Sequence, residues 1–130
     1  MPPVSTTEIH EHAFVAEGVL LTDVRGALAT PVLSTPGMIA MMEYAATSLA
    51  LLHIAPGTAT VGFEVNVKHV AAAFEGSACV ARAVLREVAD ERKYRFDVEV
   101  LAGDRTIGVG THERRVVPAP GRQSAPTEHT

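Results

Sequence analysis

The sequence predicts an α+β fold in which an antiparallel β-sheet wraps around one long, buried helix. Two observations lead to this prediction. One helical segment, residues 35–55, carries apolar or small side chains on all sides, and a helix without a charged face is buried on most of its surface. One strand-like segment precedes this helix and four follow it, joined by short turns of the kind that connect antiparallel strands.

The composition indicates a single globular domain that does not bind nucleic acid. The 130 residues suffice for one domain, and with 47% hydrophobic residues the chain can form a core, which excludes disorder for most of its length. The net charge of -4 argues against a nucleic-acid partner, because such a partner normally requires a basic face. Cys79 is the only cysteine and cannot form an intrachain disulfide, so a reducing compartment is expected.

The sequence also predicts where the protein is located and where its folded domain begins and ends. Residues 1–12 lack the basic flank and apolar core of a secretory signal. The longest apolar stretch, residues 38–52, contains Glu43 and falls short of the ~20 apolar residues that span a bilayer. We therefore expect a cytoplasmic protein without a membrane partner. Residues 1–8 are expected to be a flexible N-terminus, residues 9–117 the folded domain, and residues 118–130, which contain three prolines, a disordered tail.

The helix has recognisable start and stop signals. Thr35 is a favourable N-cap residue, and Pro36 fits the first helical position, where its missing N–H costs nothing. The segment stops at Pro56-Gly57. A helix of about eighteen residues would span roughly 27 Å.

Strands are predicted at residues 9–16, 59–70, 78–88, 92–101 and 105–117. The second alternates most clearly: Val61, Phe63, Val65, Val67 and His69 share one face, and Gly62, Glu64, Asn66 and Lys68 share the other. Short turns near Gly76, Asp90 and Gly103 predict that the last four strands form an antiparallel meander. A strand, a long buried helix and four antiparallel strands, in that order, are typical of the hot-dog fold.

Three residues could carry chemistry, and each also has a purely structural explanation. Glu43 lies in the middle of the buried helix, where burying an unpaired carboxylate would be costly. It therefore marks either a narrow solvated strip with Thr47 or an active-site carboxylate. His69, on the apolar face of its strand, is either a packed residue or a general acid or base. Thr35 is an N-cap whose hydroxyl also points toward free helix N–H groups, which attract negative charge.

The last strand contains a further candidate segment, residues 108–115. Gly108 and Gly110 within one strand indicate a close backbone approach by another chain or a ligand, whereas the following His-Glu-Arg-Arg also fits a solvated strand end. The chain has no Gly-rich phosphate loop, G-x-S-x-G or H-E-x-x-H motif. His10 and His12 form a His-x-His pair, but no cysteine or carboxylate spacing supports a metal site, so neither a metal nor a cofactor is predicted.

Three segments resemble the fluoroacetyl-CoA thioesterase family: residues 32–45 (VLSTPGMIAMMEYA), residues 67–72 (VKHVAA) and residues 108–114 (GVGTHER). They occur in the family's order and spacing, and the resemblance covers about residues 30–117. It implies that Thr35, Glu43 and His69 form the catalytic set. It also implies that Gly62 contacts the acyl thioester and that Arg114 lines the same site.

The resemblance implies a hot-dog-fold thioesterase that hydrolyses an acyl-CoA, or a related acyl-carrier thioester, to a free acid and a thiol. Hot-dog proteins close the open edge of their sheet by pairing, so we expect a homodimer with the site near the interface. Residues 26–31 lack the aromatic side chains of the family's lid, and a strong preference for the fluoroacetyl group is therefore not expected. The alternatives are a non-catalytic acyl-thioester-binding protein and a hot-dog hydroxyacyl dehydratase.

Overall fold

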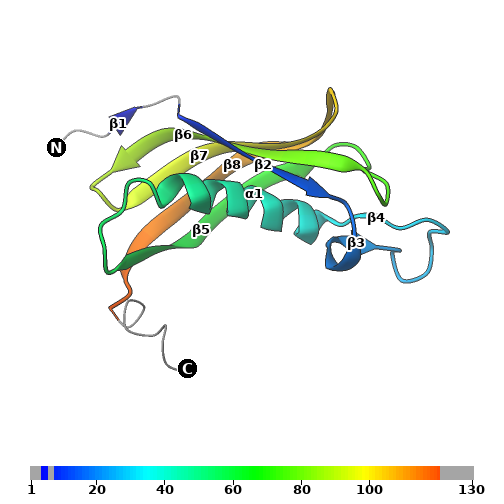
Figure 1. Cartoon of the computed structure of the whole chain (residues 1–130), viewed down its shortest axis with the longest axis horizontal. Helices are drawn as coiled ribbons and strands as arrows, with labels where there is room; N and C mark the ends of the chain where they lie inside the picture. The colour runs from blue at the N-terminus through cyan, green and yellow to red at the C-terminus, as the bar shows by residue number, and fades with distance from the viewer. Residues whose placement is uncertain (1–3, 6–7, 121–130) are drawn as a thin grey trace.

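The structure, a computed structural model, describes residues 4–5 and 8–120 of the chain (Figure 1). Residues 1–3 and 6–7 of the predicted flexible N-terminus and residues 121–130 of the predicted tail lie outside the described residues. The elements in chain order are β1 (Val4–Ser5), β2 (Ile9–Val15), the 3₁₀-helix η1 (Gly18–Leu20), β3 (Leu21–Thr22), β4 (Val32–Leu33), α1 (Thr35–Ala50), β5 (Thr58–His69), β6 (Ala78–Ala89), β7 (Lys93–Ala102) and β8 (Arg105–Pro118).

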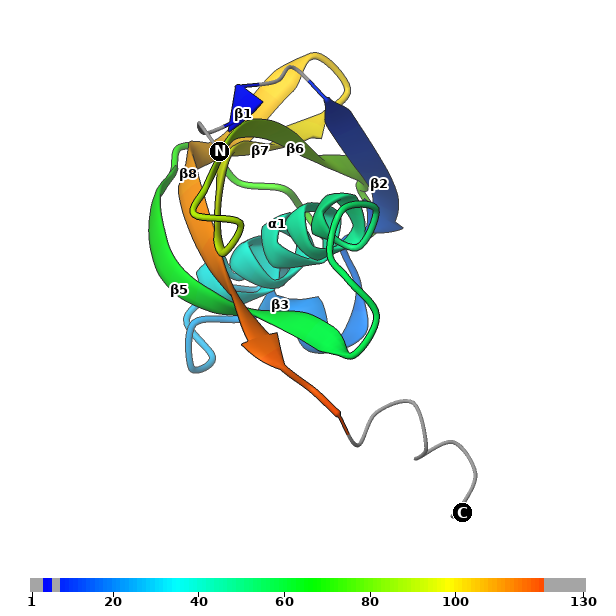
Figure 2. The same cartoon turned by 90° about the vertical axis from the view of Figure 1, so that its left-hand side faces the viewer.

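One curved antiparallel sheet wraps around α1 (Figures 1 and 2). The strands follow the order β1-β6-β7-β8-β5, and β2 also pairs with β6, so that β2 and β5 form opposite edges. β3 and β4 form a separate short ribbon before the helix. A curved antiparallel sheet around a single long helix confirms the predicted α+β hot-dog fold.

The core lies between α1 and the concave face of the sheet. Its largest fully buried side chains come from β4, α1, β6, β7 and β8: Leu33, Met38, Met42, Leu49, Leu85, Phe96, Val100 and Ile107. Fully burying one large apolar side chain contributes about 1.5–3 kcal/mol to stability. This interior therefore fixes the position of α1 against the strands that carry the candidate site residues.

The predicted meander is correct for β6, β7 and β8 but wrong for β5. β5 pairs with β8, at the far edge of the sheet, and not with its successor β6. The physical reason is the connection over residues 70–77, which is longer than the two to five residues of a usual hairpin loop and lets the chain cross to the other edge. The consequence is that Gly62 of β5 lies opposite Arg114 of β8.

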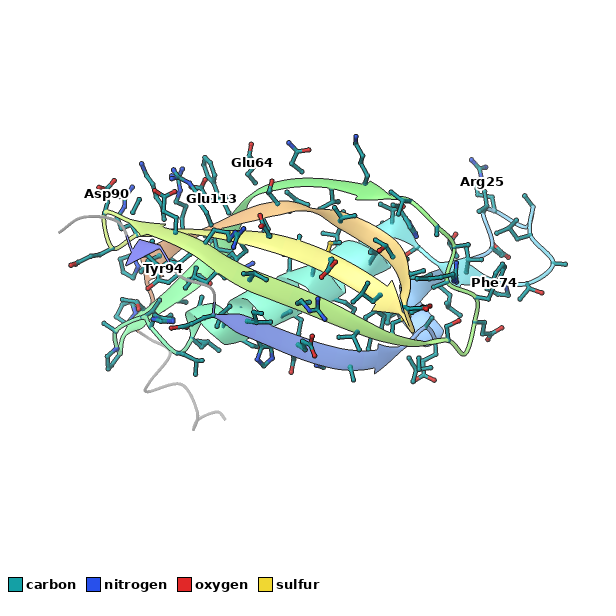
Figure 3. All side chains as sticks on the ribbon, turned by 90° about the horizontal axis from the view of Figure 1, so that it is seen from above. Arg25, Glu64, Phe74, Asp90, Tyr94 and Glu113 are labelled. Atoms are coloured by element: carbon teal, nitrogen blue, oxygen red, sulfur yellow. The ribbon has the colours of Figure 1, made fainter. Side chains whose placement is uncertain are left out.

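β5 contains a β-bulge that the sequence pattern did not reveal. Gly62 pairs with Arg114, but Glu64 pairs with the preceding residue of β8, Glu113, so Phe63 is an extra residue in β5. Figure 3 shows Glu64 and Glu113 on these neighbouring strands. A bulge breaks the regular alternation of side chains along a strand.

The bulge makes one sequence prediction wrong. Alternation placed Val61 and Phe63 on the face of His69 and Gly62 on the other face. Gly62 instead faces α1, as His69 does. A Cβ atom added to Gly62 would lie 2.8 Å from the Glu43 carboxylate of α1, and His69 contacts Thr35 of the same helix. Phe63 lies on the outer side, where the guanidinium of Arg115 covers its ring at 3.5 Å from the centroid.

The start and end of α1 also differ from the prediction. Ser34, and not Thr35, is the N-cap: its Oγ accepts a hydrogen bond of 2.9 Å from the Gly37 N–H, while Thr35 is already the first helical residue. The helix ends at Ala50, followed by turns, before the predicted stop at Pro56. In the described part of the chain no helix is long and apolar enough to cross a membrane.

Candidate active site

Thr35 and His69 are in direct contact. Thr35 Oγ1 lies 2.8 Å from His69 Nδ1, a hydrogen bond that joins the first turn of α1 to the end of β5. The Thr35 hydroxyl can make this bond because Ser34 caps the helix in its place. The other ring nitrogen, His69 Nε2, is buried and has no hydrogen-bond partner in the part of the chain that the structure describes. An unsatisfied buried polar atom typically costs about 1–3 kcal/mol, and such atoms in native proteins often have a catalytic role.

Glu43 lies in a second cluster, against the middle of β5 and β8. Its Oε2 is 3.6 Å from Arg114 Nη1 and 4.0 Å from His112 Nε2. The Glu43 side chain retains 39% of its exposure, so it can be reached from outside the chain. Gly62 lets the carboxylate approach β5 closely, since a Cβ atom there would be only 2.8 Å from Oε2. The structure thus brings together the predicted residues Glu43, Gly62 and Arg114.

Arg114 is a largely buried cation fixed by β5. Its Nε donates to Thr60 Oγ1 at 2.8 Å and its Nη2 to the Thr60 carbonyl oxygen at 2.9 Å. Burial lowers the pKa of Arg114, and the carboxylate of Glu43 acts in the opposite direction. Arg114 is therefore a buried donor group with one side turned toward Glu43.

His112 belongs to the same cluster and was not singled out from the sequence. It is 2% exposed, its Nδ1 lies 2.8 Å from the Glu64 carbonyl oxygen and its Nε2 lies 3.3 Å from Arg114 Nη1. Burial is the main cause that lowers the pKa of His112, and the Arg114 cation lowers it further. The available signal was its spacing: residues 112 and 114 of one strand share a face.

The two clusters are separate within one chain. Among residues 8–120 no hydrogen bond or ion pair joins Thr35 or His69 to Glu43. Gly62 and His69 are seven residues apart on β5, which corresponds to about 20 Å along an extended strand. A single chain therefore does not bring Thr35, Glu43 and His69 into one set of contacts.

The edge of β5 runs between the two clusters. On this strand Val61, Phe63 and Val65 are 47%, 57% and 38% exposed. β5 has a pairing partner, β8, on one side only. An unpaired edge with apolar side chains is a template for pairing with another strand.

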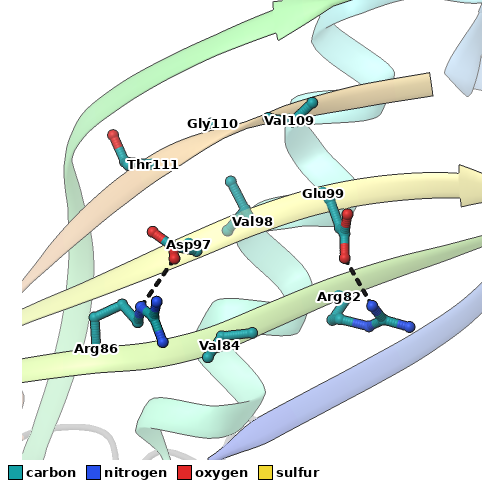
Figure 4. Close-up of a pocket in the computed structure, with 9 residues that line it drawn as sticks. All are labelled: Arg82, Val84, Arg86, Asp97, Val98, Glu99, Val109, Gly110 and Thr111. Atoms are coloured by element: carbon teal, nitrogen blue, oxygen red, sulfur yellow. Dashed lines mark hydrogen bonds and ion pairs between the residues drawn. The ribbon is translucent and has the colours of Figure 1, made fainter. Parts of the chain in front are cut away.

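Some hollows of the surface lie away from the two clusters. One of about 450 Å³ is on the outer face of the sheet and is lined by charged side chains of β6 and β7 (Figure 4). These charges neutralise one another, because Arg82 pairs with Glu99 at 2.8 Å and Arg86 with Asp97 at 2.9 Å. Within the described ranges, no group of three or more His, Cys, Asp and Glu side chains could hold a metal ion.

Comparisons with known proteins agree with this fold. A family profile described as fluoroacetyl-CoA-specific thioesterase matches residues 15–120. A solved structure of the fluoroacetyl-CoA thioesterase is 26% identical with a TM-score of 0.81, and the match covers 98% of each chain. A variant of that enzyme in complex with fluoroacetate and CoA is 29% identical with a TM-score of 0.79, over 88% of this chain and 96% of the other.

A thioesterase superfamily member from Thermus thermophilus is similar in fold, with 21% identity, a TM-score of 0.80 and coverage of 95% of this chain and 91% of the other. The comparison with curated proteins found no significant match.

Proposed function

The chain belongs to the fluoroacetyl-CoA-specific thioesterase family and is a thioester hydrolase, and we propose that it cleaves acyl-CoA through Glu43, His69 and Thr35. The observation that carries this proposal is the position of the Glu43 carboxylate. It is partly exposed, lies against Gly62 and is 3.6 Å from the buried Arg114. A carboxylate that can be reached from outside and has a fixed cation next to it suits attack on a thioester.

Two roles are open to Glu43 in this reaction: nucleophile or general base. As a nucleophile, Glu43 attacks the thioester carbonyl carbon, the C–S bond breaks, and water then hydrolyses the resulting mixed anhydride. As a general base, it takes a proton from a water molecule that attacks the same carbon, and the C–S bond breaks afterwards. The Arg114 N–H beside Glu43 would stabilise negative charge that develops on the acyl oxygen, an effect typically worth ~3 kcal/mol per donor.

His69 would donate the proton that the leaving thiolate takes up. Its Nε2 has no hydrogen-bond partner in the described chain, so one ring nitrogen has unused hydrogen-bonding capacity. The hydrogen bond between Thr35 Oγ1 and His69 Nδ1 supports a role for Thr35 in holding the imidazole ring in place. Thr35 would thus act on His69, and not on Glu43.

We further propose that two copies of the chain form the site together, as a homodimer paired through β5. The unpaired apolar edge of β5 and the separation of the two clusters within one chain support this arrangement. In an antiparallel pair of β5 strands centred between Val65 and Asn66, His69 of one copy lies opposite Gly62 of the other. Thr35 and His69 of one copy would then complete the site of Glu43 and Arg114 of the second.

A panel of acyl-CoAs with detection of free thiol tests the activity. We expect thiol release that Glu43→Gln lowers strongly and that Glu75→Gln, a change at an exposed carboxylate in a turn, leaves unchanged. Formation of a double bond in a hydroxyacyl-CoA without thiol release would instead identify a dehydratase. Binding of acyl-CoA without either reaction would identify a non-catalytic binding protein.

The acyl preference follows from the loop before α1. Residues 23–30 are all exposed and include no aromatic side chain that could cover a small acyl group. One small substituent in a pocket typically changes binding by only ~1–3 kcal/mol. We therefore expect kcat/KM for fluoroacetyl-CoA and acetyl-CoA to differ by no more than about 200-fold, and a preference of many thousandfold would contradict this expectation.

A further inference from the structure

We propose that His112 is a positioning residue that holds the Arg114 guanidinium so that one of its N–H groups faces Glu43. The proposal rests on the role assigned to Glu43 above. It concerns a side chain that makes no hydrogen bond to a reacting atom: His112 lies beside Arg114, 2% exposed, with its ring stacked on Phe96 at 6.2 Å between centroids.

The partners of His112 fix its tautomer. A backbone carbonyl oxygen can only accept a hydrogen bond, so the contact of 2.8 Å with the Glu64 carbonyl requires a proton on Nδ1. An arginine can only donate, so the contact of 3.3 Å with Arg114 Nη1 requires a lone pair on Nε2. Both conditions are met by the neutral imidazole with its proton on Nδ1, and by no other form.

The guanidinium of Arg114 is held from both sides. Thr60 accepts hydrogen bonds from Nε and Nη2 through its hydroxyl and carbonyl oxygens, and His112 accepts one from Nη1. Nη1 carries a second hydrogen, and Glu43 Oε2 lies 3.6 Å from this nitrogen. Because the guanidinium is planar and rigid, fixing its other donors sets the direction of the remaining N–H.

Among the described residues, the charged side chains that act on His112 are Arg114 and Glu43. Arg114 faces it from β8 and Glu43 from α1, at 4.0 Å, while β5 contributes the Glu64 carbonyl and β7 the uncharged ring of Phe96. A second proton on His112 would place an N–H against the N–H of a cation. Arg114 would then lose one of the contacts that direct it to Glu43.

Two substitutions separate the two halves of the imidazole. His112→Gln places an amide oxygen near the former Nε2 and can still accept from Arg114, whereas His112→Asn places its amide near Nδ1 and can only satisfy the Glu64 carbonyl. We expect His112→Gln to keep kcat within about tenfold of the wild type and His112→Asn to lose about 100-fold, the effect of misplacing a catalytic group by roughly 1 Å. Equal losses, or a greater loss for His112→Gln, would contradict the proposal, provided both variants melt cooperatively.

A measurement on the unmodified protein does not depend on activity or on the folding of a variant. Nitrogen-15 NMR of the histidine side chains distinguishes the protonated from the unprotonated ring nitrogen. At neutral pH we expect His112, assigned by the signal missing in either variant or by connectivity to its backbone, to carry its proton on Nδ1. A proton on Nε2, or a doubly protonated ring, would overturn the proposal. Absence of thioesterase activity would count against the proposed function only.

Discussion

Ser34 and Thr35, two neighbouring hydroxyl residues at the start of α1, have different partners. Ser34 accepts from the Gly37 N–H and Thr35 bonds to His69 Nδ1. We therefore expect Ser34→Ala to lower the free energy of unfolding by about 1 kcal/mol, the usual cost of a lost cap, and to leave most of kcat.

Thr35→Ala should instead lower kcat and leave most of the free energy of unfolding. Thr35→Ser, which keeps the hydroxyl, should retain much of the activity. Urea unfolding and thiol release measure the two effects separately. A Thr35→Ala variant with wild-type turnover and a stability loss equal to that of Ser34→Ala would show that Thr35 is the structural residue.

His112 should make the stability of the fold depend on pH. Burial holds its pKa below the ordinary value of 6.5, so below this pH the unfolded chain binds more protons than the folded one. The free energy of unfolding should therefore contain the full contribution of neutral His112 above about pH 6.5. It should decrease as the pH drops through the lowered pKa of His112. In urea titrations over this range His112→Gln should show a weaker pH dependence, while the control His10→Gln should follow the wild type. Identical slopes for all three proteins would contradict this explanation.

At the scale of the elements, the paired strands β5 and β8 contain two glycines that are needed for different reasons. A Cβ atom at Gly110 would overlap the backbone of Asn66 and Val67, which cannot move aside, so Gly110→Ala should cost about 1–3 kcal/mol of stability. A Cβ atom at Gly62 would meet only the end of the flexible Glu43 side chain. Gly62→Ala should therefore fold nearly as stably as the wild type but lower kcat by displacing the carboxylate.

Thermal melting and thiol release on both variants test this contrast. A Gly62→Ala protein with normal kcat would show that the space beside Glu43 is not used by the substrate.

The long elements could be predicted from the sequence because their periodicity is local. β2 and β5 to β8 lie within one residue of their predicted limits at each end. The two-residue strands β1, β3 and β4 are too short to show a period. The end of α1 was placed too late, because residues 51–55 contain no glycine or proline that would signal a stop before Pro56.

What could not be predicted depends on contacts between distant residues. The place of β5 beside β8, and the extra residue Phe63, follow from the crossing connection and the register of two strands. The glycines of β8 do mark close approaches, as predicted, but from within the chain, by Met38 at Gly108 and by β5 at Gly110. The family resemblance supplied Thr35, Glu43, His69, Gly62 and Arg114, yet their spacing could not show that they form two clusters.

At the scale of the whole molecule, one chain leaves a sheet edge open and two partial clusters on either side of it. Exposed ion pairs such as Arg86–Asp97 contribute little to stability, about 0–1 kcal/mol each, so an apolar edge is the stronger driving force for association. The chain has a mass of 13.7 kDa, and light scattering at micromolar concentration should give a dimer of about 27 kDa. A monomeric mass would count against pairing through β5.

The proposed site is shared between two copies of the chain, and mixing two inactive variants tests this sharing most directly. Glu43→Gln and His69→Ala homodimers should both be nearly inactive. In a mixed dimer one site combines the intact Glu43 of one copy with the intact His69 of the other, and the second site carries both changes. Random exchange should therefore restore about one quarter of the wild-type activity, since half the dimers are mixed and each has one intact site.

A mixture of Glu43→Gln with the double variant carrying both changes is the control, and it should stay inactive. If differently tagged subunits prove that mixed dimers of the two single variants form, and thiol release nevertheless stays at the level of the inactive homodimers, the site lies within one chain and the account is wrong.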